Sequence, residues 1–320
     1  MVLKILVSFD LPEVNIREIR SVSPEVQVRK ESKDSALIDA VGEAEILFTG
    51  EANREMITAA PKLRWIHSWG AGVDRLLSIP EMARGSIILT NSSGIHSIQI
   101  SEHVIGLMLI FTRKLKEFIL FQNDGVWHVP DETYIFDELK GKTVGIIGLG
   151  SIGSEIAKKA KCFGMTVLAI RRTITAKPTF VDELLPSYDL KRLLKESDFV
   201  VISAPLTSKT RGMIGAQEFA NMKRTAYIIN IARGEIIQQN ELIAALKQKK
   251  IAGAGLDVFE TEPLQPNSDL WHMKNVIITP HVAGETVHYY ERTTKIFCEN
   301  LRRYINKTPL INVVDKKAGY

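Results

Sequence analysis

The chain contains little cysteine and no long apolar run. Its 320 residues include only two cysteines, Cys162 and Cys298, and neither belongs to a CxxC motif. This excludes a disulfide framework, and no His, Cys or Asp spacing is typical of a metal site. No apolar stretch approaches the ~20 residues of a membrane helix, and segment 1–7 is too short for the apolar core of a signal peptide. We therefore expect a cytoplasmic protein with no metal and no membrane partner.

An excess of one charge is also lacking. The net charge is only +4, from 41 basic and 37 acidic side chains, and the densest basic clusters, such as 247–250, are short. A nucleic-acid-binding protein concentrates basic residues on one face, so we expect no nucleic acid partner. The hydrophobic share of 45% and the charged share of 24% are typical of a globular protein, and the length allows two domains with separate cores.

The first 95 residues alternate short apolar runs with helical stretches. The expected strands are 3–8, 26–28, 46–48, 65–67 and 87–89. Short strands separated by helices pair in parallel, so this part is predicted to be an α/β domain. One long apolar-periodic helix is then predicted from 97 to 121, either crossing between domains or packing in a dimer interface.

A second α/β unit begins at Lys142. A strand at 143–147, a glycine turn, a helix at 151–163 and a strand at 166–170 form one βαβ unit, and strands with intervening helices continue this pattern to residue 279. The last helix, at 285–304, is expected to return to the first domain. We thus predict two doubly wound parallel-sheet domains, one formed by 1–97 with 284–320 and the other by 98–283. The further strands are 199–203, 226–230, 253–257 and 276–279, and the further helices are 189–195, 216–222 and 240–249.

The glycine turn has the GxGxxG pattern of a dinucleotide site and lies between a strand and a helix, which is the context this motif requires. Gly148 allows the tight turn, Gly150 lets the backbone approach a pyrophosphate, and Gly153 lets the helix pack on the strand. The helix that begins at Ser151 and Ile152 offers free N–H groups to the phosphates. A purely structural turn is the alternative, and the context favours a nucleotide.

Arginines end the next strand, where an NAD site has an acidic residue. Arg171 and Arg172 follow the strand at 166–170. An acid would repel a 2′-phosphate, whereas a guanidinium binds it with charge-assisted hydrogen bonds of about 1.5–3 kcal/mol each. Two ordinary surface arginines are the alternative. We expect NADP(H) to be preferred, with NAD(H) possible.

Three chemically active side chains follow three later strands. Arg233, Glu262 and His281 are expected at the carboxyl ends of neighbouring strands, where open α/β sheets bind ligands. Arg233 is suited to bind a substrate carboxylate and polarise the adjacent carbonyl. His281 is the candidate acid that protonates the carbonyl oxygen, and Glu262 is expected to hydrogen-bond its other ring nitrogen. This set predicts reduction of a 2-keto acid by hydride transfer.

The ordered motifs at 69–74, 90–94, 101–103, 203–207 and 279–281 resemble those of the D-isomer-specific 2-hydroxyacid dehydrogenase family. The resemblance spans nearly the whole chain. It implies a Rossmann-like cofactor domain and a discontinuous flavodoxin-like substrate domain, a cleft active site, a homodimer and an Arg233, Glu262 and His281 triad. The implied substrate-carboxylate loop comprises Trp69, Gly70, Ala71, Gly72 and Val73. The implied cofactor contacts are Gly150, Ser151, Ile152, Ala204, Pro205, Thr210, Ile231, Asp257 and His281.

Departures from the common pattern narrow the function that the resemblance implies. The arginine pair at 171–172 is similar to that of glyoxylate and hydroxypyruvate reductases, which disfavours a 3-phosphoglycerate dehydrogenase. Formate dehydrogenases of the family have glutamine where this chain has Glu262, which disfavours formate as the substrate. We therefore predict reduction of a small 2-keto acid to the D-2-hydroxy acid. An NAD-dependent dehydrogenase for a bulkier substrate and a non-catalytic nucleotide sensor are the alternatives. Trp69 is interpreted either as narrowing the pocket or as packing between domains.

The remaining histidines have simpler interpretations. His67, His103 and His288 are interpreted as packing, interface or surface residues. His96, near the segment 92–94, is a further candidate for the cleft, and the loop around His128 is a candidate for the pocket of a partner subunit.

Overall fold

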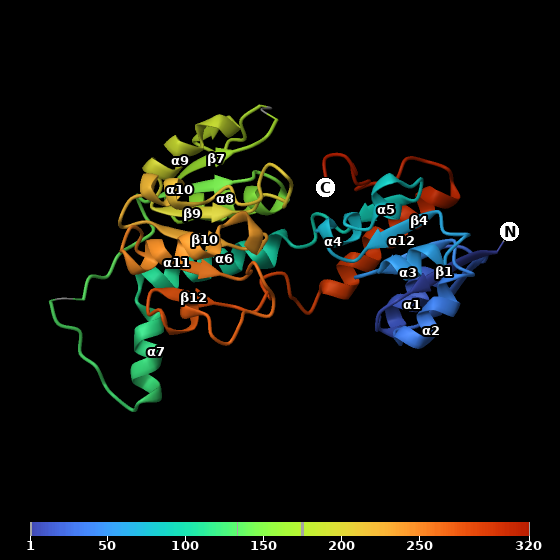
Figure 1. Cartoon of the computed structure of the whole chain (residues 1–320), viewed down its shortest axis with the longest axis horizontal. Coiled ribbons are helices and arrows are strands. Elements are labelled where there is room, and N and C mark those ends of the chain that lie inside the picture. Colours follow the sequence, from blue (N-terminus) through green and yellow to red (C-terminus); the bar gives the residue numbers. More distant parts are fainter. Residues whose placement is uncertain (1, 133, 174–175, 320) are drawn as a thin grey trace. The chain divides into compact units, whose positions relative to one another are not determined.

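The computed structural model describes residues 2–132, 134–173 and 176–319, apart from the side chains of residues 34 and 35. It divides into two compact units (Figure 1). Unit 1 consists of residues 1–96 and 285–320, and unit 2 of residues 97–284. Each unit is an α/β structure around its own parallel sheet, which confirms the predicted fold class.

The sheet of unit 1 has five parallel strands in the order β2-β1-β3-β4-β5. This is the flavodoxin-like strand order. Successive side chains of a strand point to opposite faces, so Ile5 and Val7 join a core with α1 and α12, whereas Leu6 joins one with the other helices. The strands are β1 (Leu3–Val7), β2 (Val26–Lys30), β3 (Ile46–Thr49), β4 (Trp65–Ser68) and β5 (Ile88–Asn91). The helices are α1 (Glu13–Arg20), α2 (Asp34–Val41), α3 (Arg54–Thr58), α4 (Asp74–Leu77), α5 (Pro80–Arg84) and α12 (Tyr289–Ile305).

The C-terminal helix α12 belongs to unit 1 and packs on α1. Its residues Phe297 and Leu301 are fully buried against the sheet. The helix begins at Tyr289 rather than at 285, because the amide of Tyr289 donates to the carbonyl of Thr286 in a preceding turn. After the helix, the ammonium of Lys316 donates to the carbonyls of Gly85 and Ile87 and so attaches the C-terminal segment to the sheet domain.

Unit 2 contains a seven-stranded parallel sheet in the order β12-β11-β10-β9-β6-β7-β8. Numbered from β6, the order is 3-2-1-4-5-6-7, which extends the classical dinucleotide-binding arrangement by one strand. The strands are β6 (Thr143–Ile147), β7 (Thr166–Ile170), β8 (Glu183–Leu185), β9 (Phe199–Ile202), β10 (Tyr227–Asn230), β11 (Gly253–Leu256) and β12 (Val276–Ile278). Strand β8 is absent from the sequence prediction, because its three residues are too few to produce an apolar pattern.

Helices cover both faces of this sheet. One apolar core joins the sheet to α6 (Ser97–Thr112) and α8 (Ser151–Cys162), and the other joins it to α9 (Leu190–Glu196), α10 (Ala216–Asn221) and α11 (Gln239–Lys247). All strands run parallel, so their carboxyl ends, and the loops that follow them, lie along one edge of the sheet.

The prediction of one continuous helix from 97 to 121 is wrong. Helix α6 ends at Thr112, and a separate helix, α7 (Leu115–Asn123), follows. Lys114 between them has a left-handed backbone with φ 56°, which no α-helix accommodates. Helix α7 and the segment after it project from the body of unit 2 (Figure 1).

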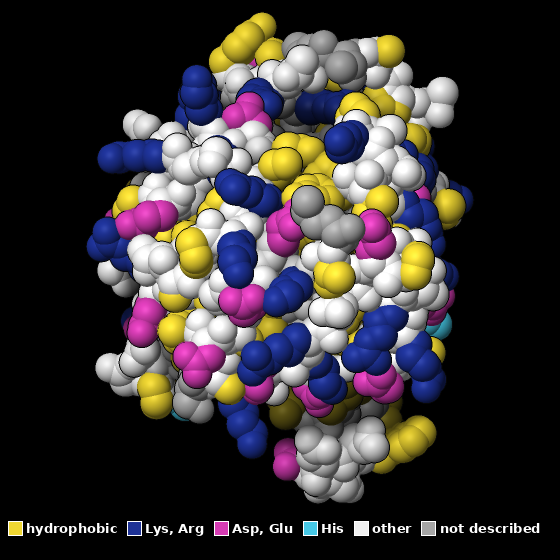
Figure 2. Space-filling view, turned by 90° about the vertical axis from the view of Figure 1, so that its right-hand side faces the viewer, with side chains coloured by type: hydrophobic (Ala, Val, Ile, Leu, Met, Phe, Trp, Pro, Cys, Tyr) yellow, Lys and Arg dark blue, Asp and Glu magenta, His cyan; other side chains and the backbone are white. Residues whose placement is uncertain are grey.

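Basic and acidic side chains are interspersed on the face drawn in Figure 2. Several exposed charges of unit 1 form ion pairs, including Lys4 with Glu43 and Lys30 with Asp10. Within the described ranges, no helix is both long and apolar enough to cross a bilayer.

Candidate active site

The glycine turn after β6 has one open position between two closely packed ones. Gly148 has φ 101°, and a Cβ there would lie 2.7 Å from the backbone of Ala204. A Cβ on Gly153 would lie 2.2 Å from the carbonyl oxygen of Gly148, so helix α8 packs directly on the turn. A Cβ on Gly150 would meet no atom within 4 Å. The space beside Gly150 and the first amides of α8, from Ser151 and Ile152, therefore suit the pyrophosphate of a dinucleotide.

The other residues expected at the cofactor lie on loops along the same edge of the sheet. Arg171 and Arg172 follow β7 directly, and Arg172 is exposed. Ala204 and Pro205 follow β9, and the hydroxyl of Thr210 donates to the carbonyl of Pro205 at 2.7 Å and accepts from the amide of Thr207. Thr210 thus closes this loop. Ile231, after β10, is buried in the core against α6 and α8.

Arg233 is presented by a short loop that Asn230 closes. The buried amide of Asn230 donates to the carbonyl of Arg233 at 2.9 Å and accepts from the amide of Ala232 at 3.1 Å. The next residue, Gly234, has no room for a side chain, because a Cβ would lie 1.8 Å from the carbonyl carbon of Phe259. The loops after β10 and β11 are therefore packed together. The guanidinium of Arg233 is half-buried and donates to the carbonyl of Ala232.

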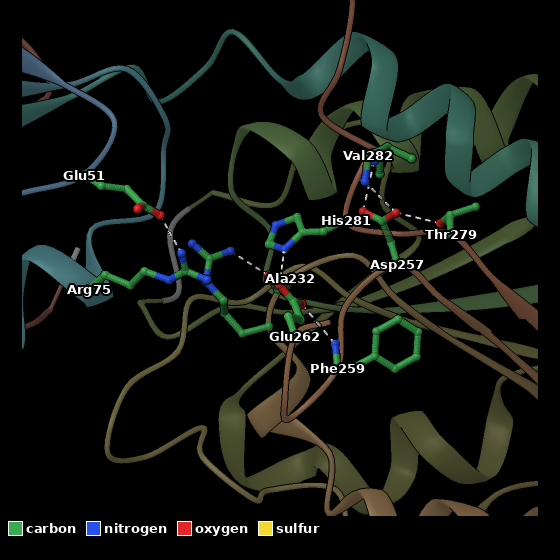
Figure 3. Close-up of polar contacts among 11 residues, drawn as sticks. Glu51, Arg75, Ala232, Asp257, Phe259, Glu262, Thr279, His281 and Val282 are labelled. Carbon is green, nitrogen blue, oxygen red and sulfur yellow. Dashed lines mark hydrogen bonds and ion pairs between the residues drawn. The ribbon is translucent and has the colours of Figure 1, made fainter. Parts of the chain in front are cut away.

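His281 and Glu262 form a hydrogen-bonded pair (Figure 3). Nδ1 of His281 lies 2.8 Å from Oε2 of Glu262, so the hydrogen bond expected between them is present. The other oxygen of Glu262 accepts from the amide of Phe259 at 3.1 Å, which fixes the carboxylate. The side chain of His281 is 45% exposed, and Nε2 has no hydrogen bond among the described residues. A ring held at Nδ1 with Nε2 accessible has the arrangement of a general acid–base group.

The backbone at His281 is held by Asp257, which is 1% exposed. Its carboxylate accepts from the hydroxyl of Thr279 at 2.6 Å and from the amides of Val282 and Ala283 at 2.9 Å, and its carbonyl accepts from the amide of His281 (Figure 3). These contacts stabilise a left-handed conformation at His281, where φ is 55°. Such conformations cost on the order of 1–3 kcal/mol and persist only where the surroundings impose them.

His103 extends this network from helix α6. Its Nε2 lies 3.2 Å from the hydroxyl oxygen of Thr279. Since the proton of that hydroxyl goes to Asp257, Nε2 of His103 is the donor. Burial lowers the pKa of His103, and the nearby negative charge of Asp257 opposes this shift. The sequence interpretation of His103 as a packing, interface or surface residue missed this role, because His103 and Thr279 are 176 positions apart and no spacing indicates the contact.

The loop expected to bind the substrate carboxylate follows β4 in unit 1. The amides of Gly70, Ala71, Gly72 and Val73 donate to no protein group in the described part of the chain. Four neighbouring N–H donors of this kind suit an anion. The indole of Trp69 packs within unit 1, with its ring centroid 4.5 Å from that of Phe9 and its edge against Gly50.

Metal-ligating side chains do not cluster in the described ranges, where no three His, Cys, Asp or Glu residues are placed to hold an ion. The two cysteines are free, Cys162 exposed and Cys298 buried.

Comparison with known proteins identifies the family. Residues 105–283 match the family model described as D-isomer specific 2-hydroxyacid dehydrogenase, NAD binding domain. The chain belongs to this family. It is 35% identical over 98% of its length to a glyoxylate reductase of Thermococcus litoralis, of which the match covers 97%.

Solved structures agree with this membership. A family protein from Aeromonas salmonicida has a TM-score of 0.88 and 32% identity, over 99% of this chain and 100% of that one. An NADPH-dependent glyoxylate/hydroxypyruvate reductase from Sinorhizobium meliloti, in complex with NADP and sulfate, has a TM-score of 0.86 and 27% identity over the same shares. The chain is therefore an oxidoreductase that acts on CH–OH groups of small 2-hydroxy acids, or on the corresponding 2-keto acids, with a nicotinamide cofactor.

Proposed function

We propose that the chain is a D-specific reductase of small 2-keto acids, with glyoxylate and hydroxypyruvate as substrates and NADPH as the preferred cofactor. The observation that carries this proposal is the His281–Glu262 hydrogen bond of 2.8 Å, which leaves Nε2 of His281 accessible at the carboxyl edge of the seven-stranded sheet. The relatives named glyoxylate reductase support the substrate class.

Each catalytic residue has a distinct task in the proposed reaction. Nε2 of His281 donates its proton to the carbonyl oxygen of the substrate, and Glu262 stabilises the imidazolium that exists before this transfer. The guanidinium of Arg233 binds the substrate carboxylate and polarises the carbonyl. The nicotinamide cofactor, when bound, supplies the hydride to the carbonyl carbon. One hydride and one proton thus convert the keto acid into the hydroxy acid.

The substrate and cofactor roles of the two units belong to the same proposal. The amides of residues 70–73 bind the substrate carboxylate, with Trp69 beside them, so 1–97 with 284–320 form the substrate domain and 98–283 the dinucleotide-binding domain. In the latter, the turn at 148–153 and the residues Ala204, Pro205, Thr210, Ile231 and Asp257 form the cofactor site. Asp257 acts there through the backbone that it holds, since its carboxylate accepts three internal donors.

The preference for NADPH is assigned to Arg171 and Arg172. They occupy the end of β7, where the ribose of the adenosine half is bound in this sheet order. Two guanidinium groups favour a 2′-phosphate by charge and by hydrogen bonding. The structural relative with bound NADP supports this assignment.

A homodimer in the cytoplasm completes the proposal. Helix α7 and the following segment expose apolar side chains to an unusual degree: Trp127 is 94% exposed and Ile135 is 75% exposed. Several large exposed apolar side chains within one segment are typical of protein interfaces. Sedimentation of the wild-type chain and of a Trp127→Ser, Ile135→Ser variant tests this assignment, which predicts a dimer for the first and a larger monomer fraction for the second. A monomeric wild type would contradict it.

Initial rates test the function itself. The purified chain is mixed with glyoxylate, hydroxypyruvate, pyruvate or phenylpyruvate, each with NADPH and with NADH. The proposal predicts the highest kcat/KM for glyoxylate or hydroxypyruvate with NADPH. Turnover of phenylpyruvate alone with NADH would instead favour the dehydrogenase for a bulkier substrate. Cofactor binding without any turnover would favour the nucleotide sensor.

A further inference from the structure

A buried chain of hydrogen bonds lies directly behind the loop 70–73 in unit 1. It begins at Trp65, whose indole Nε1 donates to Oγ1 of Thr90 at 2.8 Å. Oγ1 of Thr90 lies 2.7 Å from Nδ1 of His67, and Nε2 of His67 lies 3.1 Å from Oγ of Ser92. Ser92 in turn lies 2.7 Å from Oγ1 of Thr293 on helix α12. All five side chains are fully buried.

The indole of Trp65 fixes the direction in which each hydrogen bond of this series is donated. An indole N–H is only a donor, so Thr90 uses a lone pair for Trp65 and gives its own proton to Nδ1 of His67, its remaining partner in the described structure. His67 therefore carries its proton on Nε2 and donates to Ser92. Burial lowers the pKa of His67 to about 3, so this ring is neutral at physiological pH.

This series of hydrogen bonds ends on the backbone of the loop. Ser92 gives its one hydroxyl proton to Thr293 across the 2.7 Å contact, and Thr293 donates to the carbonyl of Trp69 at 3.2 Å. The next two carbonyls are also held, since the amide of Ser92 donates to Gly70 at 3.0 Å and the side-chain amide of Asn91 donates to Ala71 at 2.7 Å. Three successive carbonyls, from 69 to 71, thus accept from the interior of unit 1.

Each carbonyl held in this way also sets the direction of an amide. In a trans peptide unit, the C=O of one residue and the N–H of the next point in opposite directions in one plane. Fixing the carbonyls of Trp69, Gly70 and Ala71 therefore directs the N–H groups of Gly70, Ala71 and Gly72 away from the buried chain. These are the amides that lack a protein partner among the described residues.

We infer that Trp65, Thr90, His67, Ser92 and Thr293 are positioning residues that preorganise the amides of 70–72 for the substrate carboxylate. The inference rests on the proposed function in one respect, namely that this loop binds the carboxylate. Donors held in place before binding lose less entropy on binding, so the network contributes to affinity for the acid rather than to hydride transfer.

Neighbouring threonines on α12 provide a matched test. Thr293 and Thr294 are both 0% exposed, but the hydroxyl of Thr294 has no hydrogen-bond partner in the described structure, whereas Thr293 bonds to Ser92 and Trp69. Valine replaces threonine with nearly the same shape. Thr293→Val therefore removes the network contact, and Thr294→Val makes the same change without it. Thr293→Ser retains the hydroxyl and is the rescue variant, and Ser92→Ala removes the preceding link.

The measurement is titration of oxalate, a small dicarboxylate, into each NADPH-bound variant, together with KM and kcat for glyoxylate. We expect Thr293→Val and Ser92→Ala to weaken oxalate binding and raise KM by about three- to tenfold, the equivalent of one hydrogen bond. We expect kcat and the Kd for NADPH to stay within about twofold, and Thr294→Val and Thr293→Ser to resemble the wild type.

Equal oxalate affinities for Thr293→Val and Thr294→Val would overturn the inference and leave the proposed function intact. If Thr293→Val fails to fold, Ser92→Ala decides the question against the same control. A wild type that reduces glyoxylate but does not bind oxalate would overturn the assignment of the loop, and the positioning role with it. A wild type that binds oxalate but reduces none of the keto acids would overturn the proposed function alone.

Discussion

Asp257 and Thr279 are joined by a hydrogen bond of 2.6 Å, which belongs to the network that holds the backbone of His281. The same carboxylate accepts two further amides, and the carbonyl of Asp257 accepts the amide of His281. The buried residue Asp257 therefore stabilises the left-handed backbone conformation of His281. His281, the proposed acid–base residue, is thus held at its backbone by Asp257 and at Nδ1 by Glu262.

Replacement of Asp257 tests this support. Asp257→Ala leaves the hydroxyl of Thr279 and the amides of Val282 and Ala283 without their buried, charged acceptor, which should lower the free energy of unfolding by about 3 kcal/mol. Thr279→Val removes one hydroxyl and should cost about 1 kcal/mol. Urea unfolding measures both, with Asp269→Ala as the control, because Asp269 forms only an exposed ion pair with Lys247. Equal losses for Asp257→Ala and Asp269→Ala would refute the supporting role.

Arg233 should contribute to both substrate binding and turnover. Arg233→Ala removes charge-assisted hydrogen bonds to the carboxylate in the ground state and to the carbonyl in the transition state. We expect kcat/KM for glyoxylate to fall about 100-fold or more, with KM raised and kcat lowered together. Steady-state kinetics at saturating NADPH measure both. An altered KM with an unchanged kcat would restrict Arg233 to substrate binding.

Cofactor preference should follow the arginine pair after β7. Arg171→Asp with Arg172→Ala removes two cations and adds a carboxylate, so the ratio of kcat/KM for NADPH to that for NADH should fall about ten- to 100-fold. Arg224→Ala is the control, because Arg224 is exposed before β10, at the opposite edge of the sheet. A ratio that stays constant in the double variant would contradict the assignment of NADPH to these residues.

The stability of unit 1 should depend on pH through His67. Its pKa is lowered to about 3 by burial, whereas in the unfolded chain it is about 6.5. Between these values the unfolded chain binds a proton that the folded chain does not, so stability falls as pH decreases below ~6.5, by up to about 1.4 kcal/mol per pH unit. Above ~6.5 this contribution vanishes.

His67→Gln removes this titration. The variant should be less stable than the wild type at pH 7.5, because it disturbs the hydrogen bonds to Thr90 and Ser92. The difference should become smaller as the pH is lowered from 6.5 to 5, which thermal unfolding at a series of pH values measures. A difference that is independent of pH would show that His67 is not held neutral.

Strong periodic patterns made much of the fold predictable. Strands β6 and β7 begin and end where the sequence predicts, because each is a short, mostly apolar run that the polar or turn-forming residues after it bring to an end. The break between α6 and α7 was not predictable, since Lys114 is neither Gly nor Pro, and its left-handed backbone depends on tertiary packing.

The candidate site was likewise predictable only in part. The hydrogen bond between His281 and Glu262 follows from residues placed after neighbouring strands, which sequence order reveals. The network from Trp65 to Thr293 joins residues more than 200 positions apart, and no spacing in the sequence indicates it. Asn230, which closes the loop of Arg233 from three positions away, was also not among the expected residues, because the type of a residue does not indicate the loop that its side chain closes.

We propose that His281, held by Glu262, is the proton donor. The most direct measurement is kcat/KM for hydroxypyruvate with NADPH in the wild type, His281→Asn and Glu262→Gln, together with the Kd for NADPH from fluorescence. We expect kcat/KM to fall about 100- to 10,000-fold for His281→Asn and about ten- to 100-fold for Glu262→Gln, with the Kd changed less than about threefold. A His281→Asn variant that retains wild-type kcat/KM, or that loses activity only in proportion to NADPH binding, would contradict this role of His281.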